Sequence, residues 1–131
     1  MAVAAKNKAV ISKTLESYLE AVYILSENDP CVRITDISLY LGISKPSVNR
    51  AVNTLKSMGY VIHEPYSDIM LTSKGKEVGA AVFKRHHVIK KFLVSVLHIP
   101  MEQADKEAEK IERGVGQYTV DKMSEFMKNF A

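Results

Sequence analysis

The sequence SKPSVNRAVNTLKSMGY, residues 44–60, has the pattern of a single amphipathic helix. Its apolar residues recur three and four positions apart, as on one helix face: Val48, Ala51, Val52, Leu55 and Met58. Ser44 is a good N-cap, Pro46 suits a first helical turn, and Gly59 is a natural end. The opposite face holds short polar side chains and cations without an acid, which suits base edges and phosphates in a major groove. Taken alone, that face is better explained as the solvated side of an ordinary core helix, and the flanking sequence reverses this preference.

A short helix and a tight turn precede this segment. Thr35 is the predicted N-cap of a helix that runs through Leu41 and is closed by Gly42. Only Gly42 and Ile43 separate that helix from Ser44, so two helices meet across a glycine turn. This is the helix-turn-helix arrangement, in which the second helix reads DNA and the first braces it.

The other segments of the N-terminal half complete a winged helix. A helix is predicted over residues 14–25, with Thr14 as its N-cap. Two β-prone runs at residues 60–64 and 69–72 flank a turn rich in Pro, Ser and Asp at residues 65–68, which predicts a hairpin. Three helices followed by a hairpin form a winged helix, and the tip of the wing can lie along the DNA backbone or the minor groove.

The C-terminal half is predicted to be helical. Apolar spacing indicates helices at residues 74–97, 100–113 and 120–130. The predicted fold class is therefore mainly α, with an N-terminal winged helix-turn-helix domain that carries a two-stranded β wing at residues 1–73. A helical domain follows at residues 74–131.

The composition indicates a globular protein of the reducing cytoplasm. The 131 residues, of which 47% are hydrophobic and 25% charged, suffice for one compact domain or two small modules. Cys31 is the single cysteine, which excludes an internal disulfide and fits the cytosol. No apolar run approaches a membrane span and no signal-peptide core is found, so we expect a cytoplasmic protein without a membrane partner. The net charge of +3 is a weak signal for nucleic acid.

Acidic residues form a stripe in the predicted helix at residues 100–113: Glu102, Asp105, Glu109 and Glu112. Glu109 and Glu112 are neighbours on one helix face, and like charges this close repel unless a cation lies between them. That cation could be a divalent metal such as Mn, Fe(II), Co or Zn, bound by carboxylate and imidazole, or the guanidinium of Arg113. From spacing alone, a solvated stripe with nothing bound is the better explanation.

An imidazole for such a site would come from the preceding helix. His86 and His87 are adjacent there and lie about 100° apart around the helix axis, so at most one of them shares a site with the acids. The alternative is one histidine packed between helices and one on the surface.

Five segments carry a resemblance to a known family: LESYLEAVYIL (15–25), SKPSVNRAVNTLKSMGYV (44–61), LTSKGKEVG (71–79), KRHHVIKKFL (84–93) and EAEKIER (107–113). Over residues 14–130 the chain resembles the diphtheria toxin repressor and manganese transport regulator family of metal-dependent bacterial repressors. The LTSKG junction, followed by RH in the long helix, is the most specific part. The resemblance implies a winged helix, a helical dimerisation domain, and metal bound where the two meet. Metal then fixes the separation of the two recognition helices in the dimer, and the length matches the short form without an SH3-like domain.

The resemblance also implies metal ligands by position: Glu20, His86, Glu109 and Glu112. Two other ligand positions depart, because Ser17 stands for an acid or a methionine and Arg113 stands for a histidine. Arginine is always charged and cannot bind metal, so we expect one divalent ion per chain, Mn²⁺ or Fe²⁺, with Zn²⁺ or Co²⁺ as substitutes in vitro. Arg113 then either takes the space of the missing metal and neutralises Glu109 or Glu112, or points to solvent.

For DNA, the resemblance places the start of the second helix of the motif against the major groove: Ser44, Pro46, Ser47, Asn49 and Arg50. Lys45 and Lys56 are expected to contact phosphates, which adds affinity but little specificity. Whether Arg50 binds a guanine edge or a phosphate stays open at this stage.

These patterns together predict a cytoplasmic homodimer that binds double-stranded operator DNA and represses genes for manganese or iron uptake, with metal as corepressor. Apolar residues of the last helices form either the dimer surface or intrachain core: Ile99, Met101, Ala104, Ala108 and Ile111.

Three alternatives accompany this prediction. The chain could be a regulator of the same family that has lost metal control, because Ser17 and Arg113 replace ligands. It could be a winged helix that binds protein rather than DNA. A metal-dependent hydrolase is disfavoured, because the sequence has no nucleophile–base spacing and no phosphate loop. We therefore expect no enzymatic activity.

Overall fold

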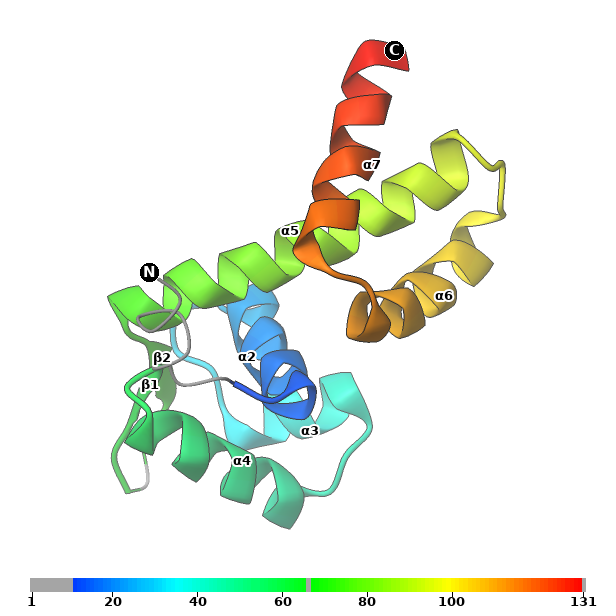
Figure 1. Cartoon of the computed structure of the whole chain (residues 1–131). Helices are drawn as coiled ribbons and strands as arrows, with labels where there is room; N and C mark the ends of the chain where they lie inside the picture. Colours follow the sequence, from blue (N-terminus) through cyan, green and yellow to red (C-terminus); the bar gives the residue numbers. More distant parts are fainter. Residues whose placement is uncertain (1–10, 66, 131) are drawn as a thin grey trace. The chain divides into compact units, whose positions relative to one another are not determined.

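The computed structural model describes residues 11–65 and 67–130 and, for Phe130, the backbone alone. Its elements are α2 (Lys13–Leu25), α3 (Ile34–Leu41), α4 (Lys45–Ser57), β1 (Val61–His63), β2 (Ile69–Leu71), α5 (Ser73–Ser95), α6 (Met101–Gly114) and α7 (Gln117–Phe130) (Figure 1). The predicted mainly α fold, with an N-terminal winged helix-turn-helix and a two-stranded wing, is confirmed. Residues 1–10 and 131 of the predicted domains, and Tyr66 of the predicted turn, lie outside the described residues. Within the described ranges, no helix combines the length and the apolar character needed to cross a membrane.

The chain divides into two compact units, and the boundary lies within α5, between Ala81 and Val82. The first unit contains α2, α3, α4, both strands and the first part of α5. The second unit contains the rest of α5 with α6 and α7. The predicted boundary lies at residues 73 and 74, where α5 begins, and that domain division stays a prediction.

The core of the first unit consists of aliphatic side chains from its helices and strands. Its largest fully buried members are Leu19, Val22, Val32, Ile37, Val48, Val52, Leu55 and Ile69. Helix α4 turns its apolar face inward, as its spacing predicts, and Met58 just after its end packs against the same core. Each fully buried aliphatic side chain contributes roughly 1.5–3 kcal/mol. Packing therefore holds α4 in place and leaves its polar face free.

Local hydrogen bonds set where the first three helices begin. Ser44 caps α4 by accepting a backbone N–H of the first turn, as predicted. The predicted cap of α2 is wrong, because Ser12 and not Thr14 accepts the first-turn N–H. Helix α3 begins one residue before its predicted cap Thr35, since the carboxylate of Asp36 accepts the N–H of the residue preceding the helix.

The turn between α3 and α4 depends on Gly42. Its φ of 68° lies in the left-handed region, which favours glycine, and it closes α3 as predicted. Its N–H donates to the Ser38 carbonyl at 2.9 Å, and the Ser38 hydroxyl donates to the Ile43 carbonyl at 2.5 Å. The polar groups of the turn are thereby satisfied, and the two helices of the motif are rigidly joined.

The predicted hairpin forms the wing. Strands β1 and β2 pair antiparallel, with Ile62 opposite Met70 and both side chains exposed. Val32, which precedes α3, exchanges two backbone hydrogen bonds with Ile69 at 2.9 and 2.6 Å. The wing is therefore attached along one edge to the segment that leads into the helix-turn-helix.

Thr72 joins the wing to α5. Its hydroxyl donates to the Gly59 carbonyl at 2.7 Å and accepts the N–H of Gly75 at 3.0 Å, so it also serves as the N-cap of α5. A Cβ at Gly75 would lie 2.0 Å from the Tyr60 carbonyl oxygen, which only glycine avoids. The Lys74 ammonium lies 4.7 Å from the centre of the Tyr60 ring and donates to a carbonyl at the end of α4. The LTSKG motif is thus explained by packing and hydrogen bonding.

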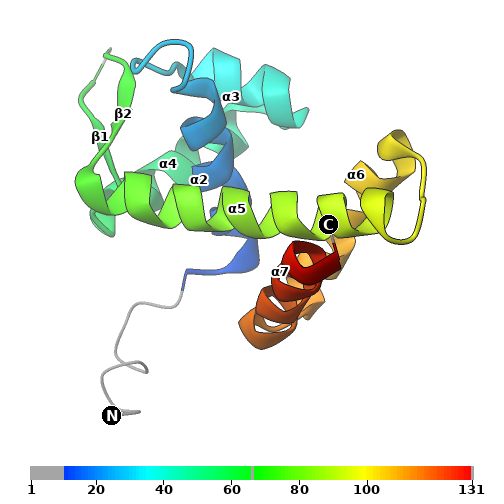
Figure 2. The same ribbon diagram turned by 90° about the horizontal axis from the view of Figure 1, so that it is seen from above.

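In the second unit, α6 and α7 pack against the last part of α5 (Figure 2). The buried side chains of this core are Ile89, Leu93, Ala104, Ala108 and Val120. Helix α7 begins at Gln117, three residues before its predicted start, and α6 begins one residue after its predicted start at Pro100. Because the core positions of α6 are alanines, its backbone lies close to α5, and polar side chains beside the alanines can reach across.

Candidate metal centre and DNA interface

The imidazole of His86 lies between two carboxylates of α6. Its Nδ1 is 3.1 Å from Glu112 Oε1, and its Nε2 is 3.2 Å from Asp105 Oδ1. Asp105 and Glu112 are seven residues apart, about two helical turns, so both face α5. The neighbouring His87 is exposed and stacks on Phe83. One histidine therefore bridges two acids of the predicted stripe, and the other does not take part.

Glu112 and Glu109 differ in burial because of their helical phase. Each residue turns the helix by about 100°, so Glu112 lies about 40° and Glu109 about 100° from the buried Ala108. Glu112 is 8% exposed and is the only buried charged residue in the part of the chain that the structure describes. Glu109 is exposed. Burying a carboxylate costs free energy unless a hydrogen-bond donor or a cation compensates its charge. Glu112 therefore needs such a partner, and the exposed Glu109 does not.

The contacts of His86 with the two acids require a hydrogen atom or a cation in addition to the single N–H of a neutral ring. A neutral imidazole carries one N–H and ionised carboxylates only accept, so a neutral ring cannot donate to Asp105 and Glu112 together. A second proton on the ring or a metal ion at one nitrogen resolves this. Two atoms that bind one transition-metal ion through bonds of about 2.1 Å lie about 3 Å apart at a right angle, close to the separation of His86 Nδ1 and Glu112 Oε1. The pair is therefore compatible with two ligands of one ion, and 3.1 Å is equally the length of an ordinary hydrogen bond.

Within the second unit, the structure brings together two of the predicted ligands, His86 and Glu112. Glu109 has no hydrogen bond or ion pair to either of them. Glu20 lies half-buried on α2 in the first unit, where the hydroxyl of Ser17 donates to a carbonyl of the same helix. Among the described residues, no three His, Cys, Asp or Glu side chains form a group that could hold a metal ion. The complete ligand set stays a prediction.

Lys90 supports Asp105 from α5. Its Nζ is 3.4 Å from Asp105 Oδ1, the oxygen that also faces His86. The hydrogen bond with His86 lowers the pKa of Asp105 below its ordinary value; burial opposes this, and the charge of Lys90 lowers the pKa further. Asp105 is therefore held as a carboxylate. The sequence predicted that Asp105 belongs to the acidic stripe, but not that it contacts His86. Lys90 could have been found from its position one helical turn after His86, which places both side chains on one face of α5.

Arg85 holds the end of α6. Its Nη2 donates to the carbonyls of Glu112 and Val115, at 3.3 and 3.0 Å. The last carbonyls of a helix lack helical partners and attract positive charge, so a guanidinium suits this position. Its buried Nε has no hydrogen-bond partner among the described residues. Adjacent residues of α5 thus fix Glu112 twice, Arg85 at its backbone and His86 at its carboxylate, and sequence reasoning missed the role of Arg85.

Arg113, the predicted metal-mimicking cation, is exposed. Within the described part of the chain its side chain makes no hydrogen bond or ion pair with Glu109 or Glu112. The guanidinium that reaches Glu112 belongs to Arg85. The hypothesis that Arg113 replaces a metal stays a prediction, without a contact in its favour.

The predicted DNA-reading face of α4 is accessible. Its exposed members are Ser44, Lys45, Pro46, Asn49, Arg50 and Lys56. Ser47 is half-buried and joins two of them: it accepts from Arg50 Nη2 at 3.2 Å, and its oxygen lies 3.0 Å from that of Ser44. The Arg50 guanidinium is therefore held towards the helix N-terminus, the part that contacts base edges in helix-turn-helix proteins.

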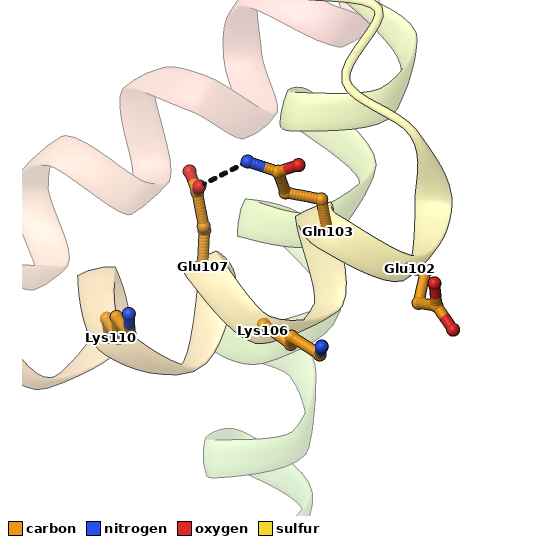
Figure 3. Close-up of a pocket in the computed structure, with 5 residues that line it drawn as sticks. All are labelled: Glu102, Gln103, Lys106, Glu107 and Lys110. Atoms are coloured by element: carbon orange, nitrogen blue, oxygen red, sulfur yellow. Dashed lines mark hydrogen bonds between the residues drawn. The ribbon is translucent and has the colours of Figure 1, made fainter.

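A depression of about 250 Å³ lies along α6 (Figure 3). Its lining residues all belong to that helix: Glu102, Gln103, Lys106, Glu107 and Lys110. Gln103 donates to Glu107 at 2.8 Å, and Figure 3 shows Glu102 directed away from this pair. One helix with mixed charges offers no converging set of groups, so we assign no chemistry to it.

Comparison with known proteins identifies the family. Residues 10–69 match the model described as iron dependent repressor, N-terminal DNA binding domain. Residues 72–131 match the iron dependent repressor, metal binding and dimerisation domain. The chain belongs to the iron-dependent repressor family. This is the diphtheria toxin repressor and manganese transport regulator family of metal-dependent transcriptional regulators, so the predicted resemblance is confirmed. The family consists of regulators and not enzymes, which confirms the prediction of no enzymatic activity and removes the hydrolase alternative.

Relatives of this chain cover most of its length. It is 33% identical over 121 residues to an HTH-type transcriptional regulator of Methanocaldococcus jannaschii, covering 92% of this chain and 97% of the relative. It is 30% identical over 117 residues to the HTH-type transcriptional regulator MntR of Bacillus subtilis, covering 89% and 82%. The solved structure of the manganese regulator SloR matches with a TM-score of 0.76 and 27% identity, covering 91% of this chain and 54% of SloR. The chain thus spans about half of SloR.

Proposed function

We propose that this chain is a metal-responsive transcriptional repressor of genes for manganese or iron uptake. It acts in the cytoplasm as a homodimer on double-stranded operator DNA, with Mn²⁺ or Fe²⁺ as corepressor. The His86–Glu112 pair carries the proposal: a ring nitrogen and a buried carboxylate lie 3.1 Å apart, in a chain whose exposed recognition helix contains no acid. Membership of the iron-dependent repressor family supports the class of function, and the likeness to a manganese regulator supports the metal.

The proposed metal site uses the four predicted ligands: Glu20, His86, Glu109 and Glu112. Imidazole with carboxylates suits Mn²⁺ and Fe²⁺, and also Zn²⁺ and Co²⁺ in vitro. A bound ion would supply positive charge beside the buried carboxylate of Glu112, and it would make or break no covalent bond. Because Ser17 and Arg113 stand at two further ligand positions of the family, we propose one ion per chain.

Metal controls DNA binding by linkage. If the ion binds the DNA-competent arrangement more tightly than the open one, it shifts the population towards the former. Each tenfold difference in metal affinity between the two arrangements is worth about 1.4 kcal/mol of that shift. The same coupling makes operator DNA raise the metal affinity, which gives a second way to measure it.

Exposed apolar side chains of the second unit form the proposed dimer surface: Leu97, Met101, Tyr118 and Phe126. This revises the residues chosen from the sequence. Ala104 and Ala108 are fully buried in the core of the unit, and Ile99 and Ile111 pack partly against that core. Of the original five residues, Met101 alone is exposed, at 63%.

DNA recognition rests on the N-terminal part of α4. We assign Arg50 to a guanine edge, because Ser47 holds its guanidinium near the helix N-terminus and a bidentate arginine suits guanine. Lys45 and Lys56 contact phosphates, and their loss lowers affinity for every sequence.

The test is titration of the full chain on DNA from upstream of its own gene. We expect tight, salt-sensitive binding with Mn²⁺ or Fe²⁺ that drops at least tenfold in chelator, and a dimer in sedimentation. Salt-independent binding, or none with any divalent metal, would contradict the proposal.

A second candidate is a regulator of the same family without metal control. It is favoured by one observation: His86, Asp105, Glu112 and Lys90 form a continuous polar cluster that a ring proton can complete without metal. Equal operator affinity in Mn²⁺ and in chelator would select this candidate over the first.

A further inference from the structure

We propose that Asn53 of α4 is a further base-reading residue, which selects an adenine in the base pair next to the guanine assigned to Arg50. The inference rests on the proposed function for the identity of the ligand, double-stranded DNA, and it does not depend on metal. The base contacts expected from the sequence end at Arg50. Asn53 lies three residues further along the helix and extends the part of α4 that specifies the operator.

Asn53 faces away from the core of the first unit as directly as Arg50 does. The buried residues of α4 are Val48, Ala51, Val52 and Leu55. Because each residue turns the helix by about 100°, the direction opposite to the mean of these four lies between Arg50 and Asn53, about 30° from each. Both side chains are exposed. If α4 meets DNA with its exposed face, it therefore presents Asn53 together with Arg50.

The spacing of Asn53 from the predicted base contacts is that of a helix lying along a major groove. In homeodomains, the residues of the recognition helix that read the groove recur three, four and seven positions apart. Pro46, Asn49, Arg50 and Asn53 have the same spacing. Asn53 is about 4.5 Å of helix rise beyond Arg50, and successive base pairs are about 3.4 Å apart, so Asn53 suits the neighbouring base pair.

The side-chain amide of Asn53 is available to a ligand, whereas nearby hydroxyls on the same face are not. The Thr54 hydroxyl donates to the Arg50 carbonyl at 3.1 Å, and the Ser57 hydroxyl donates to the Thr54 carbonyl at 2.8 Å. Within the residues that the structure describes, the Asn53 amide has no hydrogen-bond partner. Its donor and its acceptor are therefore both free.

Asparagine is an unfavourable residue for this position unless it has a function. In a helix interior it is less favourable than Ala, Lys, Gln or Glu, because its side chain competes for backbone hydrogen bonds in other conformations. Asn53 is exposed and lies in the interior of α4, so packing does not require it. Such departures from local preference are typical of functional positions.

The chemistry of the amide selects adenine. In the major groove, adenine presents the N7 acceptor beside the N6 amino donor. The Asn53 Nδ2–H can donate to N7 while Oδ1 accepts from the amino group, a bidentate match that guanine, with two acceptors, does not offer. Arg50 and Asn53 together predict a guanine and an adenine in neighbouring base pairs of the operator.

The first experiment measures base preference for the full chain in Mn²⁺ and in chelator. Selection from randomised duplexes gives the preferred site, and fluorescence anisotropy on singly substituted duplexes gives the contribution of each base pair. Arg50→Ala locates the guanine. Asn53→Ala should lower the affinity for the preferred duplex about 5–150-fold, remove the preference for adenine at the neighbouring pair, and keep the preference for guanine.

The matched control is Thr54→Ala, at the adjacent exposed position, where the hydroxyl already binds the backbone. We expect its base preferences to equal those of the wild type. Unchanged preferences in Asn53→Ala, or a loss confined to a pair that does not adjoin the guanine, would overturn the inference.

The second experiment removes one acceptor from the DNA. Replacing the selected adenine by 7-deazaadenine deletes N7 and keeps the Watson–Crick pair. The wild type should lose about fivefold in affinity, as for one hydrogen bond, and Asn53→Ala should bind both duplexes equally. Because alanine favours the helix, the urea midpoint of Asn53→Ala should equal or exceed that of the wild type.

The outcomes separate this inference from the proposed function. Equal sensitivity of the wild type and Asn53→Ala to 7-deazaadenine would overturn base reading by Asn53, and a lower urea midpoint with a uniform loss on all duplexes would assign it a structural role instead. Equal affinities in Mn²⁺ and in chelator would overturn metal control, while the base preferences would still decide the role of Asn53. A wild-type chain without any sequence preference would overturn both.

Discussion

In the first unit, Ser44, Thr72 and Lys74 bind backbone groups and set where helices begin and end, whereas in the second unit His86 and Asp105 bind each other's side chains. The core of the first unit contains large aliphatic residues and no buried charge among the described residues; the second buries Glu112 beside small alanines. In the first unit, side chains that bind backbone groups fix the ends of the helices in the DNA-binding domain. In the second unit, the ring of His86 contacts the carboxylates of Asp105 and Glu112, and a bound cation can compensate the negative charge of these carboxylates.

The largest effect is expected where the first unit has no room. Gly75→Val places a Cβ 2.0 Å from the Tyr60 carbonyl oxygen, so the junction between wing and α5 must move. We expect a loss of about 3 kcal/mol or more in the free energy of unfolding, measured with urea and circular dichroism. Gly116→Ala, where no atom lies within 4 Å, should cost less than about 0.5 kcal/mol. Equal midpoints for the two variants would show that the junction is not rigid.

The next largest effect is expected in the second unit, on metal affinity rather than on the free energy of unfolding. Glu112→Gln removes the charge that faces His86, and the Mn²⁺ affinity should fall more than about 100-fold, beyond the loss expected for a supporting residue. The matched control is Glu107→Gln, an acid of the same helix that bonds only to Gln103 in the described contacts. Calorimetry measures both. Undiminished Mn²⁺ binding by Glu112→Gln would remove Glu112 from the site.

A smaller effect tests the attachment of α6. Arg85→Met keeps a long apolar stem but loses the hydrogen bonds to the carbonyls of Glu112 and Val115. We expect the free energy of unfolding to fall by about 2 kcal/mol, since hydrogen bonds with a charged partner contribute about 1.5–3 kcal/mol. Faster amide exchange at the end of α6 should accompany this. Lys84→Met, at the exposed neighbouring position, serves as the control, and an equal loss there would refute the assigned role.

The smallest effect is expected for DNA recognition by α4. Ser47→Ala releases the Arg50 guanidinium, and operator affinity should fall by about fivefold, the worth of one hydrogen bond of about 1 kcal/mol. Discrimination at one base pair should weaken as well. Fluorescence anisotropy with operator and scrambled duplexes measures both quantities. Ser57→Ala, at the far end of α4, should change neither, and a uniform loss on all sequences would instead assign Arg50 to a phosphate.

The fold of the first unit was predictable because the sequence patterns that determine it are local. The apolar spacing of α4, the glycine turn and the two β-prone runs each act over a few residues, and each is found where the sequence places it. The errors lie at helix ends. Ser12 and Thr14 are both good caps two residues apart, and nothing in the sequence selects one. Helix α7 starts three residues early for a similar reason, since polar residues before the apolar stripe join the helix without leaving a periodic signal.

The site was only partly predictable, because its contacts depend on how α6 is rotated. Periodicity placed four acids in one stripe, but the packing of Ala108 decides that Glu112 is buried and that Glu109 is not. The sequence also suggested the cation nearest in the chain, Arg113. The fold instead brings Arg85 to Glu112 from 27 residues away. Such long-range contacts have no local signature.

Because His86 contacts two acids of α6, its contacts depend on the axial position of α6 relative to α5. Its ring meets two acids that are separated by about 10.5 Å of helix rise, so both contacts exist at one axial setting of α6 against α5. A slip of a single residue, about 1.5 Å, would exceed the tolerance of both hydrogen bonds and break them together. If a metal ion binds at this ring, as proposed, its affinity would depend on the alignment of the two helices, and a substitution far along either helix would weaken metal binding while every ligand remains.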